Sequence, residues 1–280
     1  MNITQLLEQA QSTIGGDEAL IDARYLLSDL LKKDFTWLKT WPDFELTSQQ
    51  YQDYIALIER RKSGEPIAYI TGEKEFWSLR LLTNSSTLIP RAETELLVEK
   101  ALEFLADSDQ SRILDLGTGT GAIALSIASE KINSQVTGCD FQQQAIDLAK
   151  KNATLNNITN VTFIQSDWFE YFEKNLKKPF KLIVSNPPYI DETDKHLTQG
   201  DLLYEPKSAL VSKDNGLYDI KIIISQARNY LLSGAALMIE HGYQQGADVR
   251  EIFAQSNYSK IETFVDLAGN ERVTIGLFQC

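Results

Sequence analysis

The segment Asn186-Pro187-Pro188-Tyr189 holds the residues of this 280-residue chain whose types and spacing best fit a chemical reaction. The side-chain oxygen of Asn186 and the carbonyl oxygen of Pro187 can accept the two N–H bonds of a planar NH2 group. The nitrogen lone pair is then directed at an electrophile, and holding reactants in such a geometry can supply roughly 7–11 kcal/mol of a barrier. Tyr189 offers a flat ring against the same plane. The segment therefore indicates methylation of a planar nitrogen, whereas the simpler interpretation is a proline-rich turn that ends a strand.

A glycine-rich loop precedes this segment along the chain. Arg112–Leu116 is predicted to form a short buried strand and Ala122–Ala128 the helix after it, with glycines at 117, 119 and 121 between them. Glycines in such a loop let a ligand lie against the backbone. The pattern also satisfies the loose dinucleotide fingerprint, because Asp140 follows about 20 residues further on.

Three features favour S-adenosylmethionine over a nicotinamide or phosphate ligand. Asp115 lies at the approach to the loop, where a carboxylate would repel a pyrophosphate but could pair with the cationic amino-acid end of S-adenosylmethionine, directly or through water. The glycines are not followed by Lys-[Ser/Thr], which excludes a phosphate-binding P-loop. Asn186 ends a later strand of the same sheet, where the ligand crevice of an α/β protein is expected.

Two further strand ends contribute polar and aromatic groups. Asp140 follows the predicted strand Gln135–Cys139, and its carboxylate can accept both hydroxyls of a ribose or cap the helix that starts near Gln142. Val161–Ile164 leads into Ser166-Asp167-Trp168, which offers an acceptor and an aromatic face to an adenine. A plain core role for Trp168 is the alternative.

With these motifs, the chain resembles the HemK/PrmC family of protein-(glutamine-N5) methyltransferases over nearly its whole length. The motifs that carry the resemblance are Glu65-Pro66-Ile67-Ala68-Tyr69-Ile70-x-Gly72, Phe76, Leu88-Ile89-Pro90-Arg91-Ala92-Glu93-Thr94-Glu95, Asp115 to Gly121, Val184 to Ile190, and Glu205-Pro206. The chain departs from the family pattern at Ala92, where proline is usual, and at Leu202-Leu203-Tyr204. The resemblance implies an α/β fold: a Rossmann-like class I S-adenosylmethionine-dependent methyltransferase domain with a small helical N-terminal domain.

The resemblance also implies the substrate and the site. The substrate would be the glutamine of the Gly-Gly-Gln motif in class I peptide chain release factors. Arg91, Glu93 and Glu95 would lie beside the site, although charges at a helix start explain Glu93 and Glu95 equally well. The implied cofactor-binding residues are Gly117, Thr118, Gly119, Thr120, Gly121, Asp140, Trp168 and Asn186. The implied substrate-binding residues are Asn186, Pro187, Pro188 and Tyr189, of which Asn186, Pro187 and Tyr189 are catalytic.

The predicted organisation is a helical domain over residues 1–66, a β-hairpin linker over 67–86 and the methyltransferase domain over 87–280. Apolar residues recur at helix spacing after Asp17 and again after Thr47, which can cap a helix. Ile67–Ile70 and Phe76–Leu82 are predicted to pair as the hairpin.

Beyond Asn186 the chain is predicted to form a long loop over residues 191–216, followed by a helix over Leu217–Leu232. A strand is predicted over Ala235–Glu240, and two closing strands over Lys260–Asp266 and Arg272–Phe278. A loop of this length in a compact domain is often functional.

Charge helps to separate rival substrates. The formal net charge is −12, and residues 1–85 and 86–280 are each acidic when counted separately. Binding of duplex nucleic acid usually needs several Lys and Arg contacts on one face. Arg60-Arg61-Lys62 and Lys174–Lys181 are candidate patches, but such runs are usually solvated helix faces. We therefore expect a protein substrate and no direct nucleic-acid contact.

Three alternatives remain at this stage: a glutamine methyltransferase of a ribosomal protein, an N6-adenine or N2-guanine nucleic-acid methyltransferase, and a non-catalytic binding module that keeps the fold. We expect a cytoplasmic monomer without a membrane segment, since Met1–Gln5 lacks the features of a signal peptide. Two cysteines, Cys139 and Cys280, make no disulfide framework. With His196 and His241 the only histidines, we expect no metal site.

Overall fold

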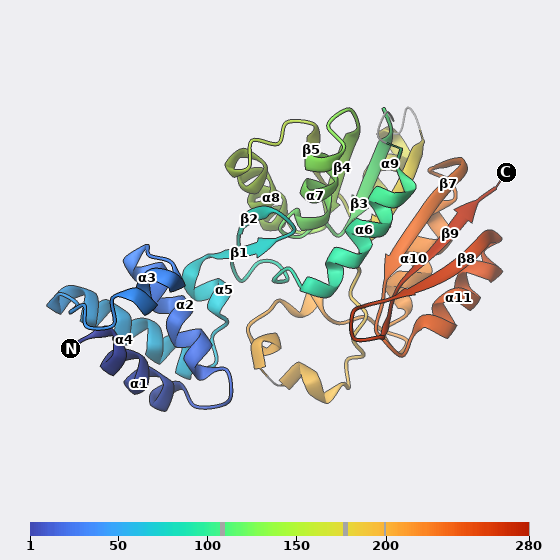
Figure 1. The fold of residues 1–280 in the computed structure, drawn as a ribbon. Helices are drawn as coiled ribbons and strands as arrows, with labels where there is room; N and C mark the ends of the chain where they lie inside the picture. Colours follow the sequence, from blue (N-terminus) through green and yellow to red (C-terminus); the bar gives the residue numbers. More distant parts are fainter. Residues whose placement is uncertain (107–109, 176–178, 199, 280) are drawn as a thin grey trace. The chain divides into compact units, whose positions relative to one another are not determined.

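The structure, a computed structural model, describes residues 1–106, 110–175, 179–198 and 200–279 (Figure 1). Packing divides the chain into two units, the first made of Met1–Glu73 with Thr198–Tyr204 and the second of Lys74–Leu197 with Glu205–Cys280. The inclusion of Thr198–Tyr204 in the first unit has no counterpart in the domain limits expected from sequence. Cys280 lies outside the described residues, and Cys139 is buried as a free thiol. Within the described ranges, no helix combines the length and apolar character needed to cross a membrane.

The first unit is built from short helices around an apolar core. Its helices are α1 (Ile3–Ile14), α2 (Ala19–Leu31), α3 (Phe35–Thr40), α4 (Ser48–Lys62), α5 (Ile67–Thr71) and the 3-10 helix η3 (Gly200–Leu203). Leu6, Leu26 and Tyr54 are among the side chains buried between them. As predicted, Thr47 caps α4: its hydroxyl accepts from the backbone N–H of Gln50, whose side chain accepts from the backbone N–H of Thr47.

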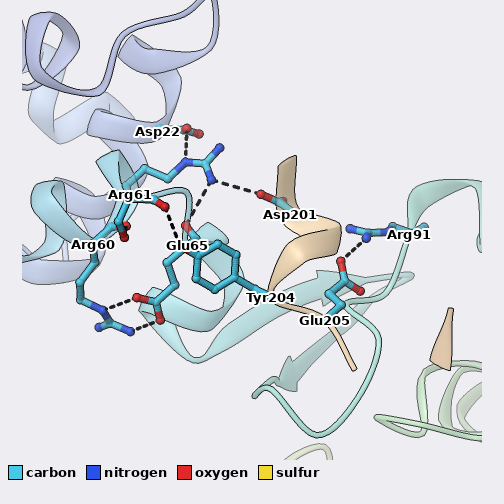
Figure 2. Close-up of polar contacts among 9 residues, drawn as sticks. Asp22, Arg60, Arg61, Glu65, Arg91, Asp201, Tyr204 and Glu205 are labelled. Carbon is cyan, nitrogen blue, oxygen red and sulfur yellow. Dashed lines mark hydrogen bonds and ion pairs between the residues drawn. The ribbon is translucent and has the colours of Figure 1, made fainter. Parts of the chain in front are cut away.

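The arginines of the candidate patch Arg60-Arg61-Lys62 are occupied within this unit. Arg61 Nε donates to Asp22 at 2.7 Å, and its Nη1 donates to Asp201 on η3 at 3.1 Å (Figure 2). Arg60 makes a two-pronged contact with Glu65. Two arginines with carboxylate partners are poorly suited to bind phosphates, so the structure favours their role as ion-paired residues of the helical unit.

The prediction of a strand over Ile67–Ile70 is wrong. These residues form α5, whose first turn is closed by hydrogen bonds from Tyr69 N and Ile70 N to the carbonyl of Pro66, both at 3.0 Å. Pro66 has the fixed φ that suits a helix start, and burial of Ala68 and Ile70 stabilises the turn. The hairpin is instead β1 (Glu73–Phe76) with β2 (Leu79–Leu82).

The second unit is organised around one twisted sheet. In the part of the chain that the structure describes, its strand order is β5-β4-β3-β6-β7-β9-β8. The strands are β3 (Arg112–Leu116), β4 (Gln135–Asp140), β5 (Val161–Gln165), β6 (Phe180–Ser185), β7 (Leu231–Glu240), β8 (Tyr258–Val265) and β9 (Glu271–Phe278). Only β9 pairs antiparallel with its neighbours β7 and β8. This Rossmann-like arrangement confirms the predicted α/β fold class.

Helices cover both faces of the sheet. Residues of α6 (Glu95–Phe104), α7 (Ala122–Glu130) and α8 (Gln143–Leu155) share one apolar core with alternate strand residues such as Ile113. A second apolar core contains residues of α9 (Glu170–Asn175), α10 (Tyr218–Ala227) and α11 (Gly246–Gln255), together with strand residues such as Leu114 and Ile183. Neighbouring strand residues therefore face opposite cores, as the period of a β-strand requires.

The helix predicted over Leu217–Leu232 is too long. Helix α10 ends at Ala227, and Leu231 already belongs to β7, where it pairs with Phe180. The hydrogen bond from Phe180 N to Tyr230 O, 2.7 Å long, ties this segment to the sheet. Tertiary pairing has overridden the local helical pattern.

In the chain between β6 and α10, the last part folds back and pairs with the first part, directly after β6. This stretch contains the 3-10 helices η2 (Lys195–Thr198), η3 and η4 (Lys207–Ala209), and it closes on Ile190, which pairs with Leu210 and Ser212 through backbone hydrogen bonds of 2.9 and 3.0 Å. Gly216 then packs against Tyr189: with φ of +81°, a Cβ at position 216 would lie 2.0 Å from the Tyr189 carbonyl oxygen.

We predict that Gly216→Ala lowers stability much more than Gly234→Ala. Both positions have left-handed φ values, so each substitution should cost about 1–2 kcal/mol in strain. Only at position 216 does the new methyl group collide with backbone, which should add about 1–3 kcal/mol. Thermal unfolding followed by circular dichroism measures both variants. Equal melting temperatures would show that the segment after β6 yields freely to the methyl group.

Candidate active site

The register of the central strands brings three strand ends to one edge of the sheet. Leu116, the last residue of β3, pairs with Cys139 of β4 on one side and with Ser185 of β6 on the other. The glycine loop follows β3, Asp140 is the last residue of β4, and Asn186 follows β6. The crevice at the carboxyl ends of parallel strands is where α/β sheets bind ligands.

Asp115 holds the glycine loop from beneath. Its Oδ2 accepts the hydroxyl of Thr118 at 2.6 Å and the N–H of Ala124, in the first turn of α7, at 3.2 Å. Complete burial raises its pKa to about 7. Its other oxygen, Oδ1, has no hydrogen-bond partner within the described residues. Through these hydrogen bonds, Asp115 connects β3 to the glycine loop and to α7.

The loop glycines have different surroundings. Gly117 and Gly119 have φ values of +71° and +54°, and a Cβ on Gly117 would meet the indole of Trp168 at 3.5 Å. A Cβ on Gly121 would lie 3.1–3.2 Å from side chains of the core beneath α7. Gly121 therefore serves helix packing, whereas Gly117 and Gly119 leave backbone open to a ligand.

Asp140 fixes the loop from the side of β4. Its Oδ2 accepts the N–H of Gly119 at 2.9 Å and its Oδ1 accepts the N–H of Gln142, also at 2.9 Å. Burial raises the pKa of Asp140, and the two N–H donors oppose that rise. Each oxygen keeps a second lone pair for a ligand hydroxyl.

A cavity of about 390 Å³ lies at this edge of the sheet, within the second unit. Pro187 and Tyr189 are not among its lining residues; Pro187 is buried, and the Tyr189 ring packs against the core that contains α10. The lining residues predicted for the site from sequence are Gly117, Thr118, Gly119, Thr120, Asp140, Trp168, Asn186 and Pro188. Ser166 and Asp167 line it beside Trp168.

Several other lining residues had no role predicted from the sequence. They are Ser86, Thr87, Leu88, Pro90, Thr94, Ala122, Ile123, Phe141, Gln142, Ser208, Ala209, Val211 and Asp219. Phe141 could have been predicted from sequence, because an aromatic residue directly after a carboxylate expected to accept ribose hydroxyls is a stacking candidate. In the structure Phe141 is 62% exposed. No local signal marks Ser208, in η4, or Asp219, in the first turn of α10.

The motif before α6 contributes unequally to the cavity. Arg91 lines it and forms an ion pair with Glu205, a fully buried carboxylate that also accepts the N–H of Ile89 at 3.1 Å (Figure 2). Glu93 is exposed, and Glu95 accepts the backbone N–H of Trp77 at 2.7 Å. Of the three charged residues that the resemblance placed beside the site, only Arg91 lines the cavity.

Asn186 is held by the 3-10 helix η1 (Ala92–Thr94), which begins at the alanine that replaces the usual proline. Its Nδ2 donates to Thr94 Oγ1 at 3.2 Å. Among the described residues, no donor is bonded to its Oδ1. Asn186 lines the cavity, and its amide oxygen keeps its capacity to accept a hydrogen bond.

Comparison with known proteins agrees with this arrangement. Residues 2–72 match a family described as the PrmC N-terminal domain, and residues 107–270 match a methyltransferase domain family. Release factor glutamine methyltransferase of Aliivibrio fischeri is 48% identical over 279 residues, covering 99% of this chain and 97% of that protein. The enzyme of the same name from Escherichia coli is 48% identical over 257 residues, covering 92% of this chain and 91% of its own.

A search of solved structures supports the fold. A methyltransferase from Pyrococcus furiosus aligns over 82% of this chain and 100% of its own, with a TM-score of 0.55 and 16% identity. Because the sequence identity is only 16%, this similarity supports the fold and not the activity. From the sequence relatives and the two matched domain families, the chain belongs to the release factor glutamine methyltransferases.

Proposed function

We propose that this protein transfers a methyl group from S-adenosylmethionine to the side-chain nitrogen N5 of the glutamine in the Gly-Gly-Gln motif of class I peptide chain release factors. The observation that carries the proposal is the position of Asn186. Asn186 lines the cavity that the glycine loop and Asp140 also line, and its Nδ2 is engaged with Thr94, which leaves its amide oxygen for a substrate N–H. Family membership supplies the substrate class, since the relatives are named for release factor glutamine methylation.

The residues present fit S-adenosylmethionine. Gly117 and Gly119 leave a backbone cradle without side chains, and Asp140 has lone pairs for ribose hydroxyls. The unpartnered oxygen of Asp115 lies beneath the same loop as a carboxylate that could interact through water with a cationic amino-acid group. When bound, S-adenosylmethionine supplies a methyl group activated on a positively charged sulfur.

The residues of the chain act mainly by positioning. Asn186 Oδ1 and the carbonyl of Pro187 accept the two N–H bonds of the glutamine amide, so that its nitrogen faces the methyl donor. A new N–C bond replaces the sulfur–carbon bond, and the nitrogen then releases one proton to water. Glutamate is rejected because its carboxylate has no N–H to offer these two oxygens. Tyr189 supports this segment through its partly buried ring, which packs against the core that contains α10.

The first unit offers a surface for the protein partner. Tyr25, Phe35, Trp41 and Phe44 are each more than 40% exposed on its helices and connecting segments. Aromatic residues are enriched at protein interfaces, so we assign release-factor recognition to this unit. Because translation termination takes place in the cytoplasm, we place the reaction there.

We predict that incubation with S-adenosylmethionine adds a single methyl group to the Gly-Gly-Gln glutamine of an unmodified release factor. Mass spectrometry of the tryptic peptides measures the product. A Gly-Gly-Glu release factor should stay unmodified and serves as the control. Ribosomal protein, tRNA and DNA are included as parallel substrates, and label found only in one of these would move the protein to that substrate class.

We predict that Asn186→Ala lowers the methylation rate about 100-fold or more while the dissociation constant of S-adenosylmethionine changes less. The variant loses the acceptor that orients the substrate nitrogen but keeps the glycine loop and Asp140. Single-turnover kinetics and calorimetry measure the two quantities. Asn229→Ala, at an exposed asparagine after α10, is the matched control. A fully active Asn186→Ala enzyme would disprove the assignment.

A further inference from the structure

A buried carboxylate behind Asn186 has no role in the reaction as described so far. Glu240 is the last residue of β7, and its side chain is 1% exposed. Strands β6 and β7 pair in parallel with Ser185 opposite Ile239, so Asn186 and Glu240, the next residues, are neighbours, and Thr94 is a further polar neighbour of both. Within the described ranges, Oε2 of Glu240 has no hydrogen-bond partner. Burial of an incompletely paired carboxylate is costly, so its presence in a site calls for a physical reason.

The hydrogen bond to Thr94 and the neighbouring Glu240 carboxylate determine which way the Asn186 amide points. A carboxylate only accepts, so the group of Asn186 that faces it must be the NH2. Thr94 Oγ1, 3.2 Å from Asn186 Nδ2, accepts from the same NH2, which leaves its hydroxyl hydrogen free to point toward the Glu240 carboxylate. Flipping the amide would bring its oxygen against the carboxylate. The NH2 end therefore faces Thr94 and Glu240, and Oδ1 faces away from them.

We propose that Glu240 is a positioning residue that acts through Asn186, holding the amide in one orientation and polarising it so that Oδ1 becomes a stronger acceptor. The inference rests on the proposed function, in which Oδ1 accepts an N–H of the substrate amide. That N–H becomes more acidic as the nitrogen gains positive charge from the methyl transfer. A negative charge behind the Asn186 amide stabilises this developing charge without touching the substrate.

The charged groups around Glu240 determine the pH range in which it is ionised and can polarise Asn186. Arg272 faces it from β9, Glu93 from η1, and the Tyr189 hydroxyl from the segment after β6. Burial, reinforced by Glu93, raises the pKa of Glu240 to about 7 in spite of Arg272 and the two polar neighbours. Because the folded pKa is raised, the carboxylate is protonated below about pH 7 and ionised above it. Polarisation of Asn186 should therefore be lost as pH falls through 7.

The kinetic test uses Glu240→Gln in the full-length protein, with single-turnover methylation of release factor measured from pH 6 to 8.5. We expect the wild-type rate to rise with pH through about 7. In the variant that rise should disappear, and the rate at pH 8 should fall about 10- to 100-fold, as for other residues that orient a site group. The dissociation constant of S-adenosylmethionine should stay within about twofold. Glu271→Gln, which removes a carboxylate on β9 paired with Arg250, is the matched control.

A double-mutant cycle separates action through Asn186 from a general structural effect. In the Asn186→Ala background, Glu240→Gln should cause no further loss of rate, because the group it orients is gone. Multiplicative losses would overturn the proposal, as would a Glu240→Gln enzyme with the wild-type rate and pH profile. Thr94→Val, which removes the bridging hydroxyl, should lower the rate in the same direction and replaces Glu240→Gln if that variant does not fold.

Nuclear magnetic resonance tests the orientation without any substrate. The Asn186 NH2 signals, identified by their absence in Asn186→Ala, should move at pH 8 when Glu240 is replaced by Gln. Unmoved signals would overturn the proposal. Moved signals in a protein that does not methylate release factor would instead refute the proposed function and leave the Glu240–Asn186 coupling intact.

Discussion

The parallel pairing of β3 with β4 on one side and β6 on the other is the constraint on which the rest of the site depends. It brings the glycine loop, Asp140 and Asn186 to one edge of the sheet, although they are separated by up to about 70 residues along the chain. Two hydrogen bonds then hold the glycine loop in place: the Thr118 hydroxyl donates to Asp115, and the Gly119 N–H donates to Asp140. A ligand at this edge meets backbone that is already ordered, which lowers the entropic cost of binding.

Three acidic groups are buried at or beside the site. Asp115, Asp140 and Glu240 all have pKa values raised by burial, within a chain that is already strongly acidic. Asp115 and Asp140 are held by hydrogen-bond donors from the chain, whereas one oxygen of Glu240 has no partner within the described residues. Perturbed carboxyl groups of this kind gather at functional sites, where their unfavourable burial is tolerated because the charge or the lone pairs are used.

The segment between β6 and α10 is divided between the two units. Thr198–Tyr204 packs with the helices of the first unit, where Asp201 pairs with Arg61 and the Tyr204 hydroxyl donates to the Ser63 carbonyl. The next residue, Glu205, is buried in the second unit and fixes Arg91 at the cavity. The departure from the family pattern at Leu202-Leu203-Tyr204 therefore falls in the part of the segment that belongs to the helical unit.

The sequence by itself determined the features that local chemistry dictates: the strand, glycine loop and helix around Gly117, the cap of α4 at Thr47, the fold class, and most of the polar residues along the cavity. Only tertiary structure decided that Ile67–Thr71 is helical, because a short apolar run suits either state until its packing partners are known. Glu240 likewise carries no local signal. Its role depends on meeting Thr94 and Asn186, and only the folded sheet brings these three distant segments together.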